Sequence, residues 1–291
     1  MNPTEFDPLE VLTWYSEAGV DIALADEPIN RFEEHRQKAE AAARRVEQKP
    51  ARNTAQPNTP QAPTRPDAAQ PPLQQQQTER TLPDANAVAQ AMELAKGAST
   101  LEELRTAVEG FQGCNLKFTA RSTVFADGDP NARLMLIGEA PGRDEDIQGL
   151  PFVGPSGQLL NRMLASIGIE RSAVYVSNIV PWRPPGNRTP TPAESEICLP
   201  FIERHIELAA PDMIMMVGGA SCKTLLRSNK GIMSLRGKWQ TLQIGDRALP
   251  AMPCLHPAYL LRTPNHKALA WNDLLAVQQR LREITTNKET D

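Results

Sequence analysis

The fold is decided at residues 134–157, which read LMLIGEAPGRDEDIQGLPFVGPSG. The segment opens with a short apolar run, LMLIG, and then turns at once into glycines, prolines and acids. Such a run is typical of a buried strand, and the glycines and prolines fix a backbone that can approach a ligand closely and expose its N–H groups. The segment therefore predicts a ligand-binding loop at the end of a strand.

Three further apolar runs end in the same way. AVYVSNIV contains Asn178, DMIMMVGG runs into Gly219, and ALPAMPCL is followed by His256 and Pro257. Helical patterns such as QLLNRMLASIG and ESEICLPFIERHIELA separate the runs. Strands that alternate with helices predict a mostly parallel sheet with helices on both faces, and ligands bind beyond the carboxyl ends of its strands. We therefore expect an α/β fold with four polar or glycine-rich strand ends at one edge of the sheet.

The loop after the first strand has two interpretations. As a bare Gly-rich turn it suits a nucleotide phosphate, yet it lacks the Lys-Ser/Thr of a P-loop and the spacing of a dinucleotide fingerprint. The acids Asp144, Glu145 and Asp146 are also expected to repel phosphate. Phe152, in the same loop, is either buried filler or a platform on which a base stacks.

The polar residues at two other strand ends are equally open to a structural or a chemical role. Asn178 either caps the following turn or uses its amide, which presents a donor beside an acceptor, to match the imide edge of uracil. His256 is either structural or a donor to an oxyanion that grows on a base carbonyl. The proline-dense loop PWRPPGNRTPTPAE (181–194) and the run LLR (260–262) supply cations and apolar side chains, which suit a DNA grip as well as a solvated loop.

The order of these motifs resembles one known family. GEAPG, GLPFVGPSGQLL, YVSNIVPWRPPGNRTPTPAE, RGKW and HPAYLLR follow one another as in the family 4 uracil-DNA glycosylases, over about residues 110–283. The resemblance implies a three-layer αβα domain with a short, mainly parallel central sheet. It also implies a monofunctional enzyme of base excision repair, which flips uracil out of DNA and hydrolyses its N-glycosidic bond.

The resemblance assigns roles to individual residues. It implies that Phe152 stacks on the flipped uracil, that Asn178 reads its polar edge, and that His256 donates to the developing charge on a uracil oxygen. Glu139 falls in the loop that holds the water and the base, and Glu145 resembles the acid that crowds the uracil C5 position. GEAPG contains no Asp to activate water, so no general base is assigned.

The remaining positions form a base-binding set and a DNA-binding set, and Leu260 in the second set is expected to be the wedge that fills the gap left by the base. The base-binding set is Gly138, Ala140, Glu145 and Phe152. The DNA-binding set is Ser156, Gly157, Arg183, Pro184, Arg188, Leu260 and Arg262.

The family's iron–sulfur cluster is not expected here. Family 4 enzymes hold a 4Fe–4S cluster on four cysteines, and the matching positions in this chain are Phe111, Cys114, Trp182 and Cys198. Because two thiolates are replaced by bulky aromatics and a cubane needs about four ligands, we predict no cofactor, with Cys114 and Cys198 as remnants and apolar packing in place of iron. Cys222 and Cys254 belong to other strand ends.

The rest of the chain divides by composition. We expect a short amphipathic helical segment at 1–33, a Pro/Gln-rich disordered linker at 34–82, a helical lead-in at 83–109, the glycosylase-like domain at 110–283 and a tail at 284–291. The segment 1–33 is expected to dock on the chain's own domain or on a partner protein. In the lead-in, Thr100 and Glu103 form the pattern of a capping box.

Charge and hydropathy bear on the protein's binding partner and on its location in the cell. The net charge of −4 divides into −7 for residues 1–109 and +3 for residues 110–291, so the acid belongs to the N-terminal part and DNA binding by the remainder is permitted. The sequence shows neither a transmembrane run nor the basic start of a signal peptide. We expect a cytoplasmic monomer that acts on uracil-containing DNA.

Two other functions remain open on the sequence. The first is a catalytically retired DNA-binding or repair-adaptor protein, although such a protein would need none of Phe152, Asn178 and His256. The second is a glycosylase for another deaminated base such as hypoxanthine, because an amide can turn over to suit a different edge.

Overall fold

The computed structural model describes residues 84–290, and the segments expected at 1–33 and 34–82 lie outside them. A six-stranded sheet in the order β1-β3-β2-β4-β6-β5 forms the middle layer. β2, β3, β4 and β6 are parallel, and β1 and β5 pair antiparallel at the two edges, so the prediction of a mainly parallel sheet is confirmed. The strands are β1 Asp127–Gly128, β2 Leu134–Gly138, β3 Tyr175–Asn178, β4 Met213–Val217, β5 Gln240–Ile244 and β6 Arg247–Cys254.

The central strands are apolar throughout because both faces of the sheet are covered. In β2, Met135 and Ile137 belong to one buried cluster, whereas Leu134 and Leu136 belong to the other. Alternation of side chains between two cores is the property of a parallel sheet buried on both faces. The apolar run that predicted a buried strand therefore serves two cores at once.

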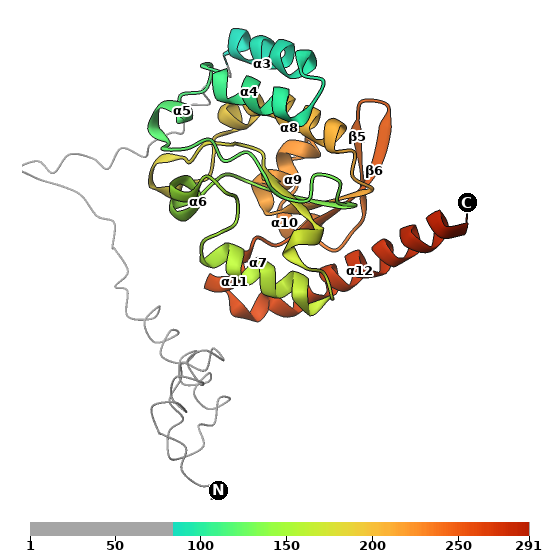
Figure 1. Cartoon of the computed structure of the whole chain (residues 1–291). Coiled ribbons are helices and arrows are strands. Elements are labelled where there is room, and N and C mark those ends of the chain that lie inside the picture. Colours follow the sequence, from blue (N-terminus) through green and yellow to red (C-terminus); the bar gives the residue numbers. More distant parts are fainter. Residues whose placement is uncertain (1–83, 291) are drawn as a thin grey trace, which may run out of the picture. The chain divides into compact units, whose positions relative to one another are not determined.

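Helices cover each face and complete the expected three-layer αβα arrangement. α3, α4 and α8 pack together on one face, and α7, α11 and α12 cover the other (Figure 1). The helices are α3 Ala85–Gly97, α4 Leu101–Gly110, α5 Leu116–Thr119, α6 Arg143–Gln148, α7 Pro155–Ser166, α8 Pro192–Ala209, α9 Gly219–Leu225, α10 Ile232–Leu235, α11 Pro257–Arg262 and α12 Lys267–Thr290, with short 3-10 turns at Arg171–Ala173, Pro185–Asn187 and Pro264–His266.

The helical lead-in is part of the domain rather than an extension before it. α3 and α4 pack on α8. Ala91 and Leu104 are fully buried, in the same hydrophobic core as side chains of the central sheet. The predicted break between these helices is confirmed: the Thr100 hydroxyl accepts from the Glu103 N–H, and the Glu103 carboxylate accepts from the N–H of Ser99, one residue before the cap.

Two further features differ from the sequence prediction. Residues 284–290, expected as a tail, continue α12. The edge strand β5, which pairs antiparallel with β6, was not predicted. The turn between the two strands contains Gly245, whose φ of +54° is a conformation that favours glycine. Within residues 84–290, no helix is long and apolar enough to cross a membrane.

Candidate active site

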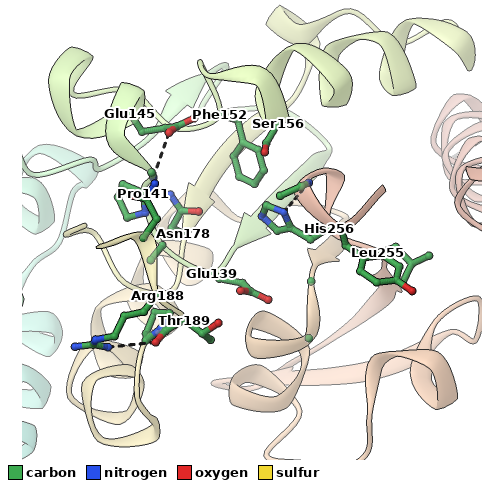
Figure 2. A pocket seen from close by; sticks show the side chains of 18 of the residues that line it. Glu139, Pro141, Glu145, Phe152, Ser156, Asn178, Arg188, Thr189, Leu255 and His256 are labelled. Atoms are coloured by element: carbon green, nitrogen blue, oxygen red, sulfur yellow. Dashed lines mark hydrogen bonds between the residues drawn. The ribbon is translucent and has the colours of Figure 1, made fainter. Parts of the chain in front are cut away.

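The carboxyl ends of the parallel strands open into a cavity of about 500 Å³. Residues from the loops after β2, β3, β4 and β6 line it, which is where the parallel topology places a ligand. Figure 2 shows Phe152, Asn178, Glu139 and His256 around one open space, each from a different loop or strand end. The sequence motifs that lie far apart along the chain therefore meet in one site.

Phe152 is held in an unusual backbone conformation. Its φ of 55° lies in the left-handed region, which costs a residue other than glycine on the order of 1–3 kcal/mol. Gly157 permits this turn, because a Cβ there would lie 1.7 Å from the Phe152 carbonyl oxygen. Gly138 gives the ring its space, because a Cβ there would lie 2.6 Å from the ring's Cζ. Both glycines thus act on the site by packing and do not line the cavity.

Glu145 fastens the loop that carries Phe152. One carboxylate oxygen accepts from the N–H groups of Val153 and Gly154 at 3.0 and 2.9 Å, and the other accepts from Gly142 at 3.1 Å. Charge-assisted bonds to backbone donors are among the stronger hydrogen bonds in proteins. Glu145 borders the cavity, but its oxygens are directed at the backbone, so this geometry favours a role in positioning the loop.

Asn178 is the last residue of β3 and is 5% exposed. It pairs in register with Gly138, and a Cβ on that glycine would lie 2.4 Å from the Asn178 side-chain oxygen. Among residues 84–290, no hydrogen bond engages its side-chain amide, although its neighbour Ser177 donates to the Phe125 carbonyl at 2.8 Å. The amide therefore keeps both its donor and its acceptor for a ligand in the cavity.

His256 has a fixed tautomer. As the N-cap of α11 its Nδ1 accepts from the N–H of Ala258 at 3.1 Å, so the proton of the neutral ring lies on Nε2. Burial lowers the pKa of His256 below its ordinary value; Glu139 opposes this shift and Arg262 adds to it. The ring stacks near Phe152, with centroids 5.7 Å apart. The site thus presents a neutral N–H donor beside the aromatic platform.

Glu139 projects from the loop after β2. Its Oε1 accepts from the N–H of Ala220 at 2.9 Å, in the first turn of α9. Gly218, whose φ is +105°, makes room for it, because a Cβ there would lie 2.5 Å from the same oxygen. The carboxylate is thereby held beside the open space of the cavity (Figure 2).

Most of the predicted site residues border this one cavity. These are Glu139, Ala140, Glu145, Phe152, Ser156, Asn178, Arg188, His256 and Arg262. Arg188 has its guanidinium bonded twice to Glu194, at 2.8 and 2.7 Å, so its charge already has a partner. Arg183 and Pro184 do not border the cavity; Arg183 donates to Asn187 at 2.6 Å.

Several lining residues were not predicted. Asn187, Thr189 and Pro190 line the cavity, and so does Tyr259. The first three lie inside the proline-dense loop, in which the sequence singles out Arg183, Pro184 and Arg188 instead. Tyr259 lies one turn of α11 beyond His256, so helical spacing from the histidine was the signal that could have found it.

Leu260 was the wrong choice for the wedge. It is 1% exposed and belongs to the core cluster on the α7 side of the sheet, whereas Leu261 is 46% exposed. α11 has only six residues, and its buried face includes Leu260. The exposed apolar side chain at this position is therefore Leu261.

The expectation that the three loop acids repel phosphate needs correction, because two of the three do not face solvent. Glu145 and Asp146 are 9% and 5% exposed. One Asp146 oxygen accepts from the N–H groups of Arg121 and Ser122 at 2.8 and 3.0 Å. These two carboxylates hold backbone together and do not present charge that would repel a phosphate.

The four positions that match the cluster ligands do not fit a cluster. Phe111 and Trp182 are each 1% exposed and stack with centroids 6.4 Å apart, while Phe111 packs edge-on against Phe201 at 5.1 Å. Cys114 and Cys198 are buried, and a hydrogen bond between the thiols lowers the pKa of Cys114, whereas the same bond and burial raise that of Cys198. Two thiols beside packed aromatic rings offer half of the ligands that a cubane needs.

Comparison with known proteins identifies the family. Residues 125–275 match the model of the uracil DNA glycosylase superfamily. The chain is 33% identical over 185 residues to the type-4 uracil-DNA glycosylase of Sulfurisphaera tokodaii, which covers 62% of this chain and 84% of that protein. It is 35% identical over 168 residues to the type-4 enzyme of Thermotoga maritima, which covers 57% of this chain and 86% of that protein. The chain belongs to the uracil DNA glycosylase superfamily and, within it, to the type-4 family.

A similar region also occurs in a much larger protein. A DNA polymerase of Bacillus phage SP01 is 32% identical over 148 residues, which are 50% of this chain and 16% of that polymerase.

The tautomer of His256 leads to a prediction about pH. Because burial lowers its pKa below 6.5, the ring is neutral at neutral pH and gains a proton only as the pH falls through that lower value. Protonation removes the Nδ1 acceptor and so breaks the cap of α11. We expect kcat/KM for uracil release to keep its plateau down to pH 6.5 and to fall below it.

His256→Gln is the matched control, because it keeps an N–H donor but does not titrate. The acidic fall attributed to His256 should be absent from the pH profile of this variant. A fall centred above pH 6.5, or an identical fall in the variant, would contradict the assignment.

Proposed function

We propose that the chain is a uracil-DNA glycosylase, which flips uracil out of DNA and hydrolyses its N-glycosidic bond. The observation that carries this proposal is the meeting of an aromatic face, an unengaged amide and a neutral N–H donor in one cavity, from Phe152, Asn178 and His256. A flipped base needs a surface to stack on and polar groups that read its edge.

The chemistry follows from where charge develops. As the glycosidic bond breaks, uracil leaves with a negative charge on its carbonyl oxygens, and a positive charge grows on the sugar. The Nε2–H of His256 donates to such an oxygen. The donor is set in advance by the Ala258 N–H on the other ring nitrogen, so no reorientation is needed during the reaction. Asn178 holds the imide edge with one donor and one acceptor.

Glu139 is suited to stabilise the positive charge that develops on the sugar in the transition state. One carboxylate oxygen is bonded to the Ala220 N–H, and the residue borders the cavity. Its negative charge favours the oxocarbenium-like sugar, and its second oxygen can orient the attacking water. We assign no general base beyond this, and the crowding of uracil C5 by Glu145 stays a prediction, because the Glu145 oxygens hold the loop backbone.

DNA binding is proposed for the rim of the cavity. Arg262 and Ser156 border it, and Leu261 is the exposed apolar side chain that takes the wedge role in place of Leu260. The proposal further places the protein in the cytoplasm as a monomer, with residues 1–33 recruiting a protein partner; these residues lie outside the described part of the chain.

The proposal also includes the absence of an iron–sulfur cluster. It is supported by the stacking of Phe111 on Trp182 and by the Trp182 indole N–H, which donates to the Thr123 hydroxyl at 3.1 Å. These contacts join α4 and the segment before β1 to the proline-dense loop without a metal.

Iron analysis tests this part. We expect purified protein to be colourless, with iron and acid-labile sulfide far below one cluster per chain, and uracil release to be unaffected by an iron chelator. The double variant Cys114→Ala/Cys198→Ala should keep wild-type activity, since alanine fits an apolar core. Stoichiometric iron and sulfide in the wild type, lost in the double variant, would overturn the proposal.

The activity itself is tested by alkaline-sensitive cleavage of a labelled oligonucleotide that holds one uracil. We expect wild type to create abasic sites, and Asn178→Ala and His256→Ala each to lose on the order of 10²–10³ in single-turnover rate, the size typical of removing one such donor. Met92→Ala, an exposed position on α3, is the control and should keep full activity.

Other outcomes separate the alternative functions. If wild type binds the DNA and releases no uracil, the chain is a DNA-binding adaptor. If it acts on hypoxanthine and leaves uracil in place, the base assignment is wrong. A chain that starts at Asp84 should retain activity; loss with the fold intact would place the functional boundary further upstream.

A further inference from the structure

Three large apolar side chains are exposed on α5, on α6 and directly after α6. Phe118 on α5 is 65% exposed, Ile147 on α6 is 47% exposed, and Leu150 after α6 is 41% exposed. Hydrogen bonds join the two segments: one oxygen of Asp146, the neighbour of Ile147, accepts from the N–H groups of Arg121 and Ser122, three and four residues after Phe118.

The charge on this surface is positive. Arg121 and Arg143 are exposed at its two sides, whereas Glu145 and Asp146 are turned inward and bonded to backbone N–H groups. Asp144 is the remaining acid of α6 and is only partly exposed. We name the set Phe118, Arg121, Arg143, Ile147 and Leu150 the α5–α6 patch.

The patch is continuous with the active site. Gly142 and Glu145, at the start of α6, border the cavity, and Ile147 and Leu150 lie at and just beyond its other end. A helix of this length spans about 9 Å. A DNA strand that leaves the cavity on this side therefore meets the patch within a short distance of the flipped nucleotide.

We infer that the α5–α6 patch binds the bases of unpaired DNA next to the uracil, which makes single-stranded DNA a preferred substrate. The inference rests on the proposed glycosylase function. Aromatic and aliphatic side chains flanked by arginines are the combination by which proteins bind single strands, because bases stack on the apolar groups and the cations follow the phosphates. Paired bases in a duplex have no free face to offer to Phe118. The exposed arginines and the continuity with the cavity favour DNA over a protein at this surface.

Binding to undamaged single-stranded DNA tests the patch without relying on catalysis. The full chain and its Phe118→Ala variant are compared by fluorescence anisotropy on a mixed-sequence oligonucleotide and on the same sequence as a duplex. We expect Phe118→Ala to raise Kd for the single strand at least about fivefold, the lower end of what one base–aromatic stack contributes, and to leave the duplex Kd unchanged. Met92→Ala, at a 57% exposed position on α3, is the control and should change neither.

A second experiment locates the contact. Single strands with uracil near one end have a flank on one side only, either 5′ or 3′. The patch lies to one side of the cavity, so Phe118→Ala should raise KM for one of these substrates and not for the other, with kcat unchanged for both.

The outcomes separate the two proposals. An unchanged single-strand Kd in Phe118→Ala overturns the patch as a binding site for unpaired DNA, whether or not uracil is released. An equal loss on single strand and duplex also overturns it, because stacking on unpaired bases cannot produce that result. A selective loss of single-strand binding in a chain that releases no uracil would support the patch while the glycosylase function fails.

Discussion

The site depends on one backbone turn, the left-handed conformation of Phe152. This conformation is unfavourable on its own, and three features hold it: the missing side chain at Gly157, the space above Gly138, and the bonds from Glu145 to the N–H groups of Val153 and Gly154. The GLPFVGPSG motif is thus a device for presenting one aromatic ring. Without it the cavity would still have polar groups, but no face on which a planar base could lie.

The polar groups are arranged in advance by the same fold. Asn178 ends a buried strand, and its amide has no partner among the described residues; His256 has its tautomer set by the first turn of α11; Glu139 is bonded to α9. Each group belongs to a different strand end, so their mutual positions are fixed by the sheet and not by flexible loops. A site that is already in place when the base arrives spends little of its binding energy on reorganisation.

Sequence alone was sufficient wherever one physical rule decides the outcome. Parallel strands end at the same edge, so four polar strand ends predicted the site, and helices alternating with apolar runs predicted the layers. The choice of Leu260 as the wedge could not be made correctly from the sequence. α11 has only six residues, which is too short for periodicity to show its buried face, so Leu260 and Leu261 could not be told apart. The inward turn of Glu145 and Asp146 could not be foreseen either, since it depends on which backbone N–H groups the fold brings near them.

A crystal structure of the protein with free uracil tests the central claim most directly. We predict the uracil ring parallel to Phe152, its imide edge on the Asn178 amide, and a carbonyl oxygen within hydrogen-bond distance of the His256 Nε2. Uracil bound outside this cavity, or bound inside it with the imide edge turned away from Asn178, would contradict the account.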